Sequence, residues 1–347
     1  MQPKRFFQIG FLTLLFFSCQ QEEEIIIGAN NDPAPNALVV SSPLIKLISR
    51  VTQVPTSADN ALDGTSCFAV QLPITIVINS QTISVASFND YQTVQNNKDA
   101  STSDDDVVNF VYPIILLSKN GTRKNINNSA ELDSARANCQ NEENLTEISC
   151  ASFVYPILVN VYDTNDQLAN TFTLQNNIQF FGFISNLTLT TISEIDYPII
   201  GVNASGTNVI ITDNVALENF IENAIPDCAG NNSVGSSSFA DIVTSGTWRV
   251  SYYYEDDDET DEYVESNFTF NVNNTVTVLK NGQISGGTWS NFTAGSSSIL
   301  RLTLTEDDLS ELEKDWRIME FTTSFIRLKE QVTSDDDDIS YLNFTKN

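Results

Sequence analysis

The sequence predicts a mainly β or α+β chain, in which a duplicated, disulfide-stapled region precedes a small eight-stranded antiparallel meander barrel. Three observations carry this prediction. The pentapeptide FVYPI occurs twice, at 110–114 and at 153–157, within a longer series of repeats. Four cysteines bracket that series at regular spacing. Short runs of alternating polarity, rich in β-branched and aromatic residues, fill the last third of the chain, as is typical of antiparallel strands.

The repeats are set out by four prolines, each followed by isoleucine and spaced 40, 43 and 42 residues apart: Pro73, Pro113, Pro156 and Pro198. A fixed period of this size indicates an internal repeat. After each proline come an apolar strand, a polar turn and a second strand, and then an apolar residue: Tyr91, Leu132, Leu174 or Leu217. Each unit is therefore predicted to be a hairpin plus a short helix. Asn120-Gly121 is a strong hairpin signal, and Ser129 and Asp213 are predicted helix N-caps.

The cysteines indicate that the true repeat is two units long. Cys67 and Cys150 each lie six residues before a proline and 83 residues apart, while Cys139 and Cys228 close the second and fourth units. This placement predicts the disulfides Cys67–Cys139 and Cys150–Cys228 among the three pairings that four cysteines allow. The chain has no histidine and no CxxC, so a zinc site of the ordinary kind is excluded.

The first residues predict a secreted protein. Lys4 and Arg5 precede the apolar run FFQIGFLTLLFFS, which fits a secretory signal and is too short to cross a bilayer. The run ends at Ser18-Cys19, and Glu22–Glu24 follow closely. These residues resemble the signal of bacterial lipoproteins, and the acidic run is similar to the surface-export signal of Bacteroidota. The resemblance implies lipidation of Cys19 and an outer-membrane protein facing the cell exterior. The alternative, an ordinary secreted protein, leaves Cys19 as an odd thiol.

These features divide the chain into six segments. They are a signal peptide (1–18), an acidic and polar tether (19–60), repeat domain copy 1 (61–140), repeat domain copy 2 (141–229), a Gly/Ser/Asn linker (230–239) and the barrel domain (240–347). Below, "copy 1" and "copy 2" denote the two repeat domains. The disulfides predicted within each copy persist in an oxidising compartment, which agrees with secretion.

The barrel domain begins with Gly246-Thr247-Trp248 and contains eight predicted strands, with a short helix over EDDLSELEK capped by Thr305. Gly-Thr-Trp resembles the Gly-x-Trp of lipocalins and of the lipocalin-like domains of Bacteroidota surface proteins. That resemblance implies a lipocalin-like barrel plugged by Trp248. Aromatic residues alternating along the strands form a candidate ligand pocket: Trp248, Tyr252, Tyr254, Phe268 and Phe270. Core packing is the alternative use of this face.

The composition argues against catalysis. Without histidine the common triads and the usual general base are absent, and the sequence has no SxxK, GxSxG or phosphate-binding glycine loop. We therefore expect no enzyme and no cofactor. A carboxylate pair of the glycosidase kind remains open, because the chain has 45 acids. Acidic clusters supply weak calcium candidates: Asp104, Asp106, Asp256, Asp258, Asp336 and Asp338. The alternative is that these clusters keep loops solvated and edge strands unpaired.

The net charge of −28 disfavours nucleic acid, and removal of residues 1–18 takes away two further positive charges. We expect a non-catalytic surface lipoprotein that binds or presents a glycan, a peptide or a small apolar molecule. Its one predicted partner is the membrane, reached through the lipid anchor at Cys19. The alternatives are a structural spacer or adhesion stalk without a small ligand, and a carboxylate-dependent hydrolase.

Overall fold

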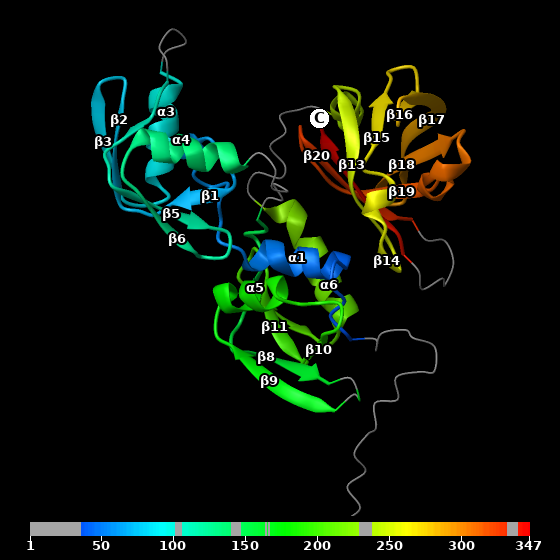
Figure 1. Cartoon of the computed structure of the whole chain (residues 1–347), viewed down its shortest axis with the longest axis horizontal. Helices are drawn as coiled ribbons and strands as arrows, with labels where there is room; N and C mark the ends of the chain where they lie inside the picture. The colour runs from blue at the N-terminus through cyan, green and yellow to red at the C-terminus, as the bar shows by residue number, and fades with distance from the viewer. Residues whose placement is uncertain are drawn as a thin grey trace, which may run out of the picture.

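The structure, a computed structural model, describes residues 36–100, 106–139, 147–163, 165, 167–228, 238–331 and 339–347. Figure 1 shows three lobes, which correspond to copy 1, copy 2 and the barrel. Each lobe has its own apolar core. Within the described ranges, every helix is too short or too polar to cross a bilayer.

Copy 1 contains two three-stranded sheets, with strand orders β3-β2-β4 and β1-β5-β6. Its elements are α2 (Asn60–Asp63), β1 (Phe68–Val70), β2 (Ile74–Ile78), β3 (Gln81–Val85), α3 (Asp90–Lys98), β4 (Asn109–Phe110), β5 (Ile114–Ser118), β6 (Arg123–Ile126) and α4 (Ser129–Asn138). Each proline is followed by a hairpin and a helix, as predicted. Gly121 takes the positive φ of 78° that the β5–β6 turn requires.

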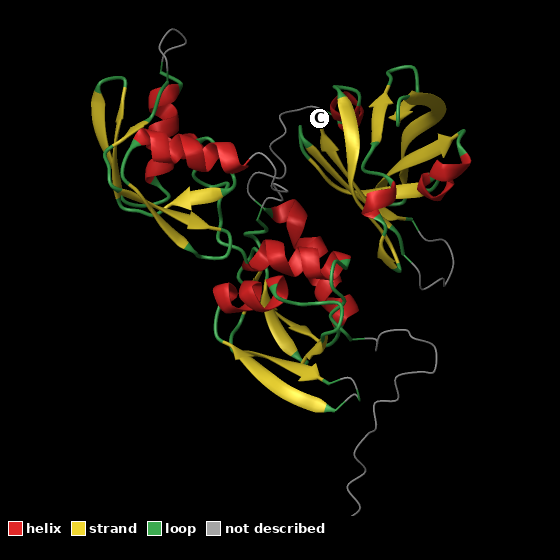
Figure 2. Ribbon diagram, in the orientation of Figure 1, coloured by secondary structure: helices red, strands yellow, loops and turns green. Residues whose placement is uncertain are grey.

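Copy 2 repeats this plan, with strand orders β10-β8-β9 and β12-β11-β7. Its elements are β7 (Ser152–Phe153), β8 (Ile157–Tyr162), β9 (Leu168–Leu174), α5 (Asn177–Ser185), β10 (Ile192–Ile195), β11 (Ile199–Val202), β12 (Asn208–Ile211), α6 (Asn214–Ala224) and the 3-10 helix η2 (Ile225–Asp227). The helices lie together on one side of the strands (Figure 2). The predicted disulfide Cys150–Cys228 is present, with its Cα atoms 4.8 Å apart.

The tie between the two units of each copy is an exchange of strands. In copy 1, β1 of the first unit pairs with β5 of the second, and β4 of the second pairs with β2 of the first. Copy 2 does the same with β7 on β11 and β10 on β8. A single unit therefore lacks one strand of its own sheet. This explains why two units, about 83 residues, form the domain.

Each proline marks the point where the chain passes from one sheet to the other. All four X-Pro bonds are cis: Leu72-Pro73, Tyr112-Pro113, Tyr155-Pro156 and Tyr197-Pro198. The residue two before each proline donates its amide to the carbonyl two after the partner proline. These bonds are Gln71 to Ile115 (2.8 Å), Val111 to Thr75, Val154 to Ile200 and Asp196 to Leu158 (each 2.9 Å). FVYPI is thus a sheet-crossing segment, and its repetition follows from the repeated crossing.

The C-terminal lobe is a closed eight-stranded antiparallel barrel, as predicted. The strands are β13 (Thr247–Glu255), β15 (Ser266–Phe270), β16 (Thr275–Lys280), β17 (Gln283–Ala294), β18 (Ser297–Leu304), β19 (Asp315–Phe321), β20 (Phe325–Glu330) and β21 (Tyr341–Lys346). They pair in chain order, and β13 pairs with β21 to close the barrel. A short β14 (Asp257–Asp258) folds back on the end of β13.

Side chains fill the barrel, and short helices cover both of its ends. Helix α7 (Phe239–Val243) precedes β13, and the Trp248 indole donates to the Val243 carbonyl over 2.7 Å. The 3-10 helix η4 (Asp307–Leu312) follows β18, so the alternating strand directions place it at the opposite end, near η3 (Thr260–Glu262). There the Trp316 indole donates to the Leu312 carbonyl over 2.9 Å. The interior is consequently one apolar cluster sealed by two tryptophans.

The segment predicted as a tether needs correction over its second half. Residues 43–52 form α1 (Pro43–Thr52), which begins with Ser42 accepting the Ile45 amide over 3.4 Å. Leu44, Leu47 and Ile48 recur at helical spacing and enter the core of copy 2, where α1 packs on α5 and α6. The polar composition of the whole segment concealed this amphipathic helix. Residues 19–35 lie outside the described ranges.

Of the three predicted helix N-caps, one is confirmed and two are displaced by one residue. Asp213 caps α6 as predicted and accepts the Ala216 amide over 2.7 Å, but α4 is capped by Asn128 instead of Ser129. An Asn side chain reaches the N3 amide as readily as Ser, so the two candidates were equivalent in sequence. The predicted helix after β18 exists as η4, whose N-cap is Glu306; Thr305 donates instead to the Gly286 carbonyl.

Two further predictions concern the Cys67–Cys139 disulfide and the linker over residues 230–239. Cys67 lies close to Cys139, with its Sγ 3.3 Å from the Cys139 carbonyl oxygen, and the disulfide between them stays a prediction. Nearly all of the predicted linker falls outside the described ranges. Its last two residues, Ser238 and Phe239, already form the capping box and first residue of α7.

We predict that Gly201→Ala destabilises copy 2. A Cβ at Gly201 would lie 2.5 Å from the Phe220 ring, and such overpacking costs about 1–3 kcal/mol. In copy 1 the position of Gly201 is taken by Leu116 and that of Phe220 by Ala135. The small and the large residue of this contact are therefore exchanged between the two copies. The double variant Gly201→Leu/Phe220→Ala should therefore be more stable than Phe220→Ala alone. Urea unfolding measures all three, and equal stability of the latter two would contradict this exchange.

Candidate functional site at the junction of α1 and the barrel

Two asparagines that the repeat motif positions bind the N-terminal segment to copy 2, one at the end of α1 and one before the helix begins. The Tyr155 hydroxyl donates to Asn177 Oδ1 over 2.6 Å, and the Asn177 amide lies 3.3 Å from the Val51 carbonyl at the end of α1. Tyr197 likewise donates to Asn214 over 2.8 Å, and Asn214 donates to the Ala37 carbonyl over 3.1 Å. The tyrosines that precede the cis-prolines of copy 2 thus orient the side chains that bind the N-terminal segment.

The opposite face of α1 contacts the outside of the barrel. Arg50 donates two hydrogen bonds, of 2.8 and 2.9 Å, to the two carboxylate oxygens of Glu320 on β19. Both side chains are at most 3% exposed. Burial alone raises the pKa of the Glu320 carboxyl, but the charge and hydrogen bonds of Arg50, with the further charge of Arg327, hold that pKa below its ordinary value.

A second set of ion pairs joins the barrel to α6. Arg327 on β20 donates to Glu222 over 3.1 Å, and Lys329 donates to Glu218 over 2.6 Å. The Tyr341 hydroxyl also donates to Glu218, over 2.5 Å. Strands β19–β21 therefore present a charged outer surface to α1 and α6. The attraction within such buried pairs is offset by the cost of desolvating the charges, so they add little net stability, but loss of one partner is costly.

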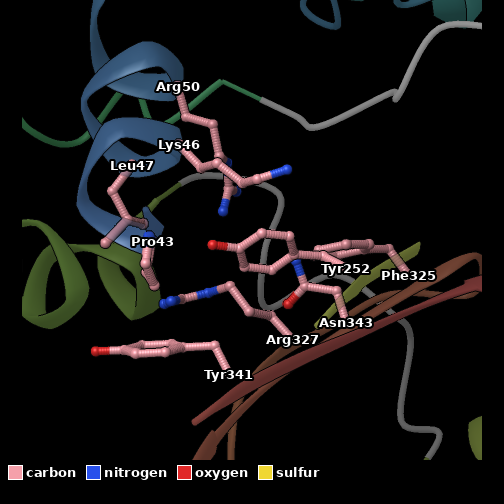
Figure 3. Close-up of a pocket in the computed structure, with 9 residues that line it drawn as sticks. All are labelled: Pro43, Lys46, Leu47, Arg50, Tyr252, Phe325, Arg327, Tyr341 and Asn343. Atoms are coloured by element: carbon pink, nitrogen blue, oxygen red, sulfur yellow. The ribbon is translucent and has the colours of Figure 1, made fainter. Parts of the chain in front are cut away.

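A small cavity lies between these elements (Figure 3). Its volume is about 20 Å³, room for one water-sized species. The lining residues come from α1 and from the barrel: Pro43, Lys46, Leu47, Arg50, Tyr252, Phe325, Arg327, Tyr341 and Asn343. Lys46 places its Nζ 4.0 Å from the centre of the Tyr252 ring, whose hydroxyl donates to the Ser41 carbonyl over 2.6 Å.

A larger groove shares Lys46 with this cavity. It has a volume of about 590 Å³, within the usual range of small-molecule sites. Its walls come from the N-terminal segment, from the loop after α5 and from the β13–β14 turn with η3. They comprise Val39, Val40, Ser41, Lys46, Leu189, Ser251, Asp257, Asp258, Thr260 and Asp261. One wall is therefore acidic, while Lys46 supplies a cation and the valines and Leu189 supply apolar surface.

The predicted barrel pocket is divided by a β-bulge. Trp248, Phe268 and Phe270 point into the barrel, where they belong to its packed core. The register of β13 shifts between Val250 and Tyr252, so Tyr253 takes the inward position. Tyr252 and Tyr254 consequently face outward, Tyr252 against α1 and Tyr254 against Tyr341. Placing these two tyrosines with the interior aromatics was wrong, because a bulge leaves no mark on the alternation of the sequence.

Three of the six calcium candidates lie within the described residues, and these three form no metal site. Asp104, Asp336 and Asp338 lie outside the described ranges. Asp258 uses Oδ1 to accept from the Thr260 amide (3.1 Å) and hydroxyl, and Asp256 has a φ of 55° in the turn after β13. Asp106 belongs to copy 1. Over the described residues, no three His, Cys, Asp or Glu side chains converge as a metal site requires.

The structure brings a serine and a lysine together at one end of the barrel. Lys314 Nζ lies 2.5 Å from Ser340 Oγ, a pairing found in some hydrolases. Here the same ammonium contacts Glu255 over 2.8 Å and Glu330 over 3.2 Å, so its three donors are divided between two carboxylates and the serine. Burial raises the pKa of Glu255, but the hydrogen bonds of Lys314 and Tyr253 outweigh it and leave that pKa lowered. The arrangement is that of an ion-pair network.

Copy 1 contains a buried pair of carboxyl groups at α2. Asp59 and Asp63 are 1% and 2% exposed. Asp59 Oδ2 accepts the Val70 amide over 2.6 Å and Asp63 Oδ1 accepts the Thr65 amide over 3.1 Å, which leaves the second oxygen of each without a hydrogen bond. Burial raises the pKa of Asp59 to about 6, and burial together with the charge of Asp59 raises that of Asp63 to about 8.

Sequence reasoning missed Arg50, Glu320, Arg327 and Lys46, because they are far apart in the chain and form no motif. Arg50 lies on α1 away from the face formed by Leu44, Leu47 and Ile48, where a charged residue normally faces solvent. The sequence therefore gives no sign that Arg50 is buried, and its partner lies 270 residues away. Cys19, the predicted lipidation site, lies outside the described ranges.

Comparison with known proteins adds little. No family model matches the chain, and no curated protein matches it. A crystal structure of a DUF4847 family protein from Bacteroides vulgatus is similar over 32% of this chain and 98% of its own, with 16% identity and a TM-score of 0.24. A likeness at that TM-score carries no argument about fold or function.

We predict that Arg50→Met separates the barrel from copy 2. Removal of one partner from a buried ion pair costs about 3–5 kcal/mol, because the other charge remains buried. The double variant Arg50→Met/Glu320→Leu should restore most of the contact. Small-angle scattering measures the separation, and the three tryptophans, all in the barrel, report whether the barrel itself stays folded. Arg301→Met, which removes an exposed pair with Asp315, is the control and should change nothing.

We predict that the Asp59–Asp63 pair destabilises copy 1 as the pH rises. Both pKa values are raised above the ordinary 3.8, so the folded state holds protons that the unfolded state has lost. The associated stability is fully present below about pH 4 and is lost as the pH passes about 6 and then about 8. The Asn side chain of the Asp63→Asn variant cannot ionise. The melting temperature of this variant should therefore fall less than that of the wild type between about pH 5 and about pH 9. Asp133→Asn, on the exposed face of α4, should follow the wild type; a parallel Asp63→Asn curve would contradict the assignment.

Proposed function

We propose that this chain is a non-catalytic, lipid-anchored protein of the outer-membrane surface that binds and presents a ligand in the groove beside Lys46. The observation that carries the proposal is the groove itself, whose volume of about 590 Å³ suits a small ligand. Its walls belong to three parts of the chain that α1 holds together. The barrel interior is filled by side chains, which moves the expected site from the barrel to this groove.

The chemistry of the walls favours a ligand with a cationic group and an apolar part. Asp257, Asp258 and Asp261 line the groove together with Val39 and Val40. A basic peptide or an amino sugar fits this pattern better than an anionic polymer, which the net charge of −28 repels. The anchor is expected at Cys19, on the resemblance of residues 1–24 to lipoprotein signals and not on the fold.

A structural spacer is the second candidate function, and the ion pairs around Arg50 favour it. They bury charge between lobes, which fixes the barrel on copy 2 in one orientation. A spacer needs such rigidity and needs no ligand. The two candidates differ in what the groove does, so a binding experiment separates them.

The test is a screen of peptide and glycan arrays with the purified soluble chain, followed by titration of each hit. Asp257→Asn and the double variant Asp257→Asn/Asp261→Asn remove carboxylates that line the groove, and the double variant should weaken binding of a cationic ligand at least tenfold, about 1.4 kcal/mol. Asp227→Asn, which makes the same chemical change on exposed η2, is the control and should bind normally. Binding that survives the groove variants, or no binding to any array, would favour the spacer.

Anchoring is tested separately in cells. Metabolic labelling with a fatty acid should mark the wild type and leave Cys19→Ser unmarked. Protease added to intact cells should remove the protein, because a surface protein is exposed to it. Complete protection would place the protein inside the outer membrane and exclude surface presentation.

A further inference from the structure

The walls of the large groove beside Lys46 are divided between two lobes. Its acidic residues and two of its hydroxyl residues belong to the barrel: Ser251, Asp257, Asp258, Thr260 and Asp261. Its apolar residues belong to copy 2 and to the N-terminal segment that copy 2 binds: Val39, Val40 and Leu189. The groove is therefore complete only while the barrel is docked against α1 and copy 2.

Leu189 represents copy 2 in this groove. Its side chain is 92% exposed, on the loop after α5, and it lines the groove. The three acids reach the same groove from β14 and from η3 of the barrel. A ligand that covers Leu189 with its apolar part and meets the acids with its cationic group must contact both lobes at once.

The junction that keeps the groove complete is held mainly by polar contacts. The described buried apolar residues of copy 2 and of the barrel form two separate clusters, so no shared apolar core crosses the junction. It is crossed instead by the Arg50–Glu320 pair and by the pairs of Arg327 and Lys329 with the acids of α6. Because desolvation offsets the attraction in such pairs, we expect the docked arrangement to be favoured only slightly over separated lobes.

Both lobes also carry a negative net charge. Residues 141–229 contain 11 Asp and Glu and no Lys or Arg, and residues 240–347 contain 21 Asp and Glu against 8 Lys and Arg. The lobes therefore repel each other wherever their acids are not paired. A cation in the groove lowers this repulsion, because the acids of β14 and η3 lie there, where the barrel meets copy 2.

Binding and docking are consequently linked, since a ligand that fits only the docked arrangement shifts the lobes toward it. We propose that a cationic ligand with an apolar part closes the barrel onto copy 2, and that the Arg50–Glu320 pair, which does not line the groove, sets the affinity of the groove. The linkage rests on the proposed ligand-binding function. It adds that occupancy of the groove controls the arrangement of the lobes.

The probes for the test are two peptide amides, acetyl-Leu-Lys-amide and acetyl-Leu-norleucine-amide. They have closely similar shapes and differ in the ammonium group. Equilibrium titration of the soluble chain measures the Kd of each. The lysine probe should bind the wild type, and the norleucine probe should bind about tenfold more weakly or worse, because it gives the acids of the groove no charge to meet.

Variants of the junction test the linkage. Arg50→Met changes no residue of the groove, yet it should raise the Kd of the lysine probe about tenfold or more, because the apparent Kd rises as the docked fraction falls. Arg50→Met/Glu320→Leu removes both buried charges and should recover most of the affinity. Lys329→Met, which loses its pairs with α6, should also weaken binding, so the test does not depend on one variant folding. Arg301→Met is the exposed control and should bind like the wild type.

The reverse effect is measured by small-angle scattering. The radius of gyration of Arg50→Met should fall toward that of the wild type at saturating lysine probe and should not change with the norleucine probe. Reciprocity requires both effects, since linkage acts equally on binding and on docking.

The possible failures differ in what they overturn. If the wild type binds the lysine probe and both Arg50→Met and Lys329→Met bind it equally well, the groove binds a ligand independently of docking. The linkage is then overturned while the proposed function stands. If the wild type does not bind the lysine probe, the pairing of a cation with an apolar part is wrong and the linkage falls with it. The array screen then decides the proposed function by itself.

Discussion

The arrangement of the lobes depends on α1, a helix of ten residues with two different faces. Its apolar residues complete the core of copy 2, and Arg50 on the other side meets Glu320 of the barrel. The apolar face supplies the free energy of burial, while the ion pair fixes which part of the barrel docks. Both pockets described above border this helix, so the geometry of the candidate site follows from it.

The repeat domains are stable units because neither half can close its own sheets. Each unit donates a short strand to its partner, and the proline after that strand turns the chain into the other sheet. Copy 2 adds a use of its own for this motif. Its tyrosines, Tyr155 and Tyr197, orient Asn177 and Asn214, which bind the segment around α1. The proline motif crosses between sheets in both copies, and in copy 2 it also helps to bind the N-terminal segment.

Aromatic residues of the barrel strands pack inside the barrel at some positions and contact the N-terminal segment outside it at others. Trp248, Phe268 and Phe270 fill the interior, and both ends are covered by short helices. The bulge after Val250 turns Tyr252 outward, where it contacts the segment before α1. The groove that could hold a ligand therefore lies on the outside of the barrel, where β13, β14 and η3 face the N-terminal segment and the loop after α5.

The sequence alone determined the local architecture. Proline spacing predicted the four hairpin-plus-helix units, and alternating polarity predicted eight barrel strands, because these elements depend on residues close together in the chain. Cysteine spacing predicted Cys150–Cys228, 78 residues apart, because the repeat period marks which cysteines bound one copy. The tertiary structure decided the strand exchange, the docking of α1, the outward turn of Tyr252 and the cavity at Arg327. These depend on which distant surfaces meet. Arg50 and Glu320 are 270 residues apart, and no local pattern records that they are partners.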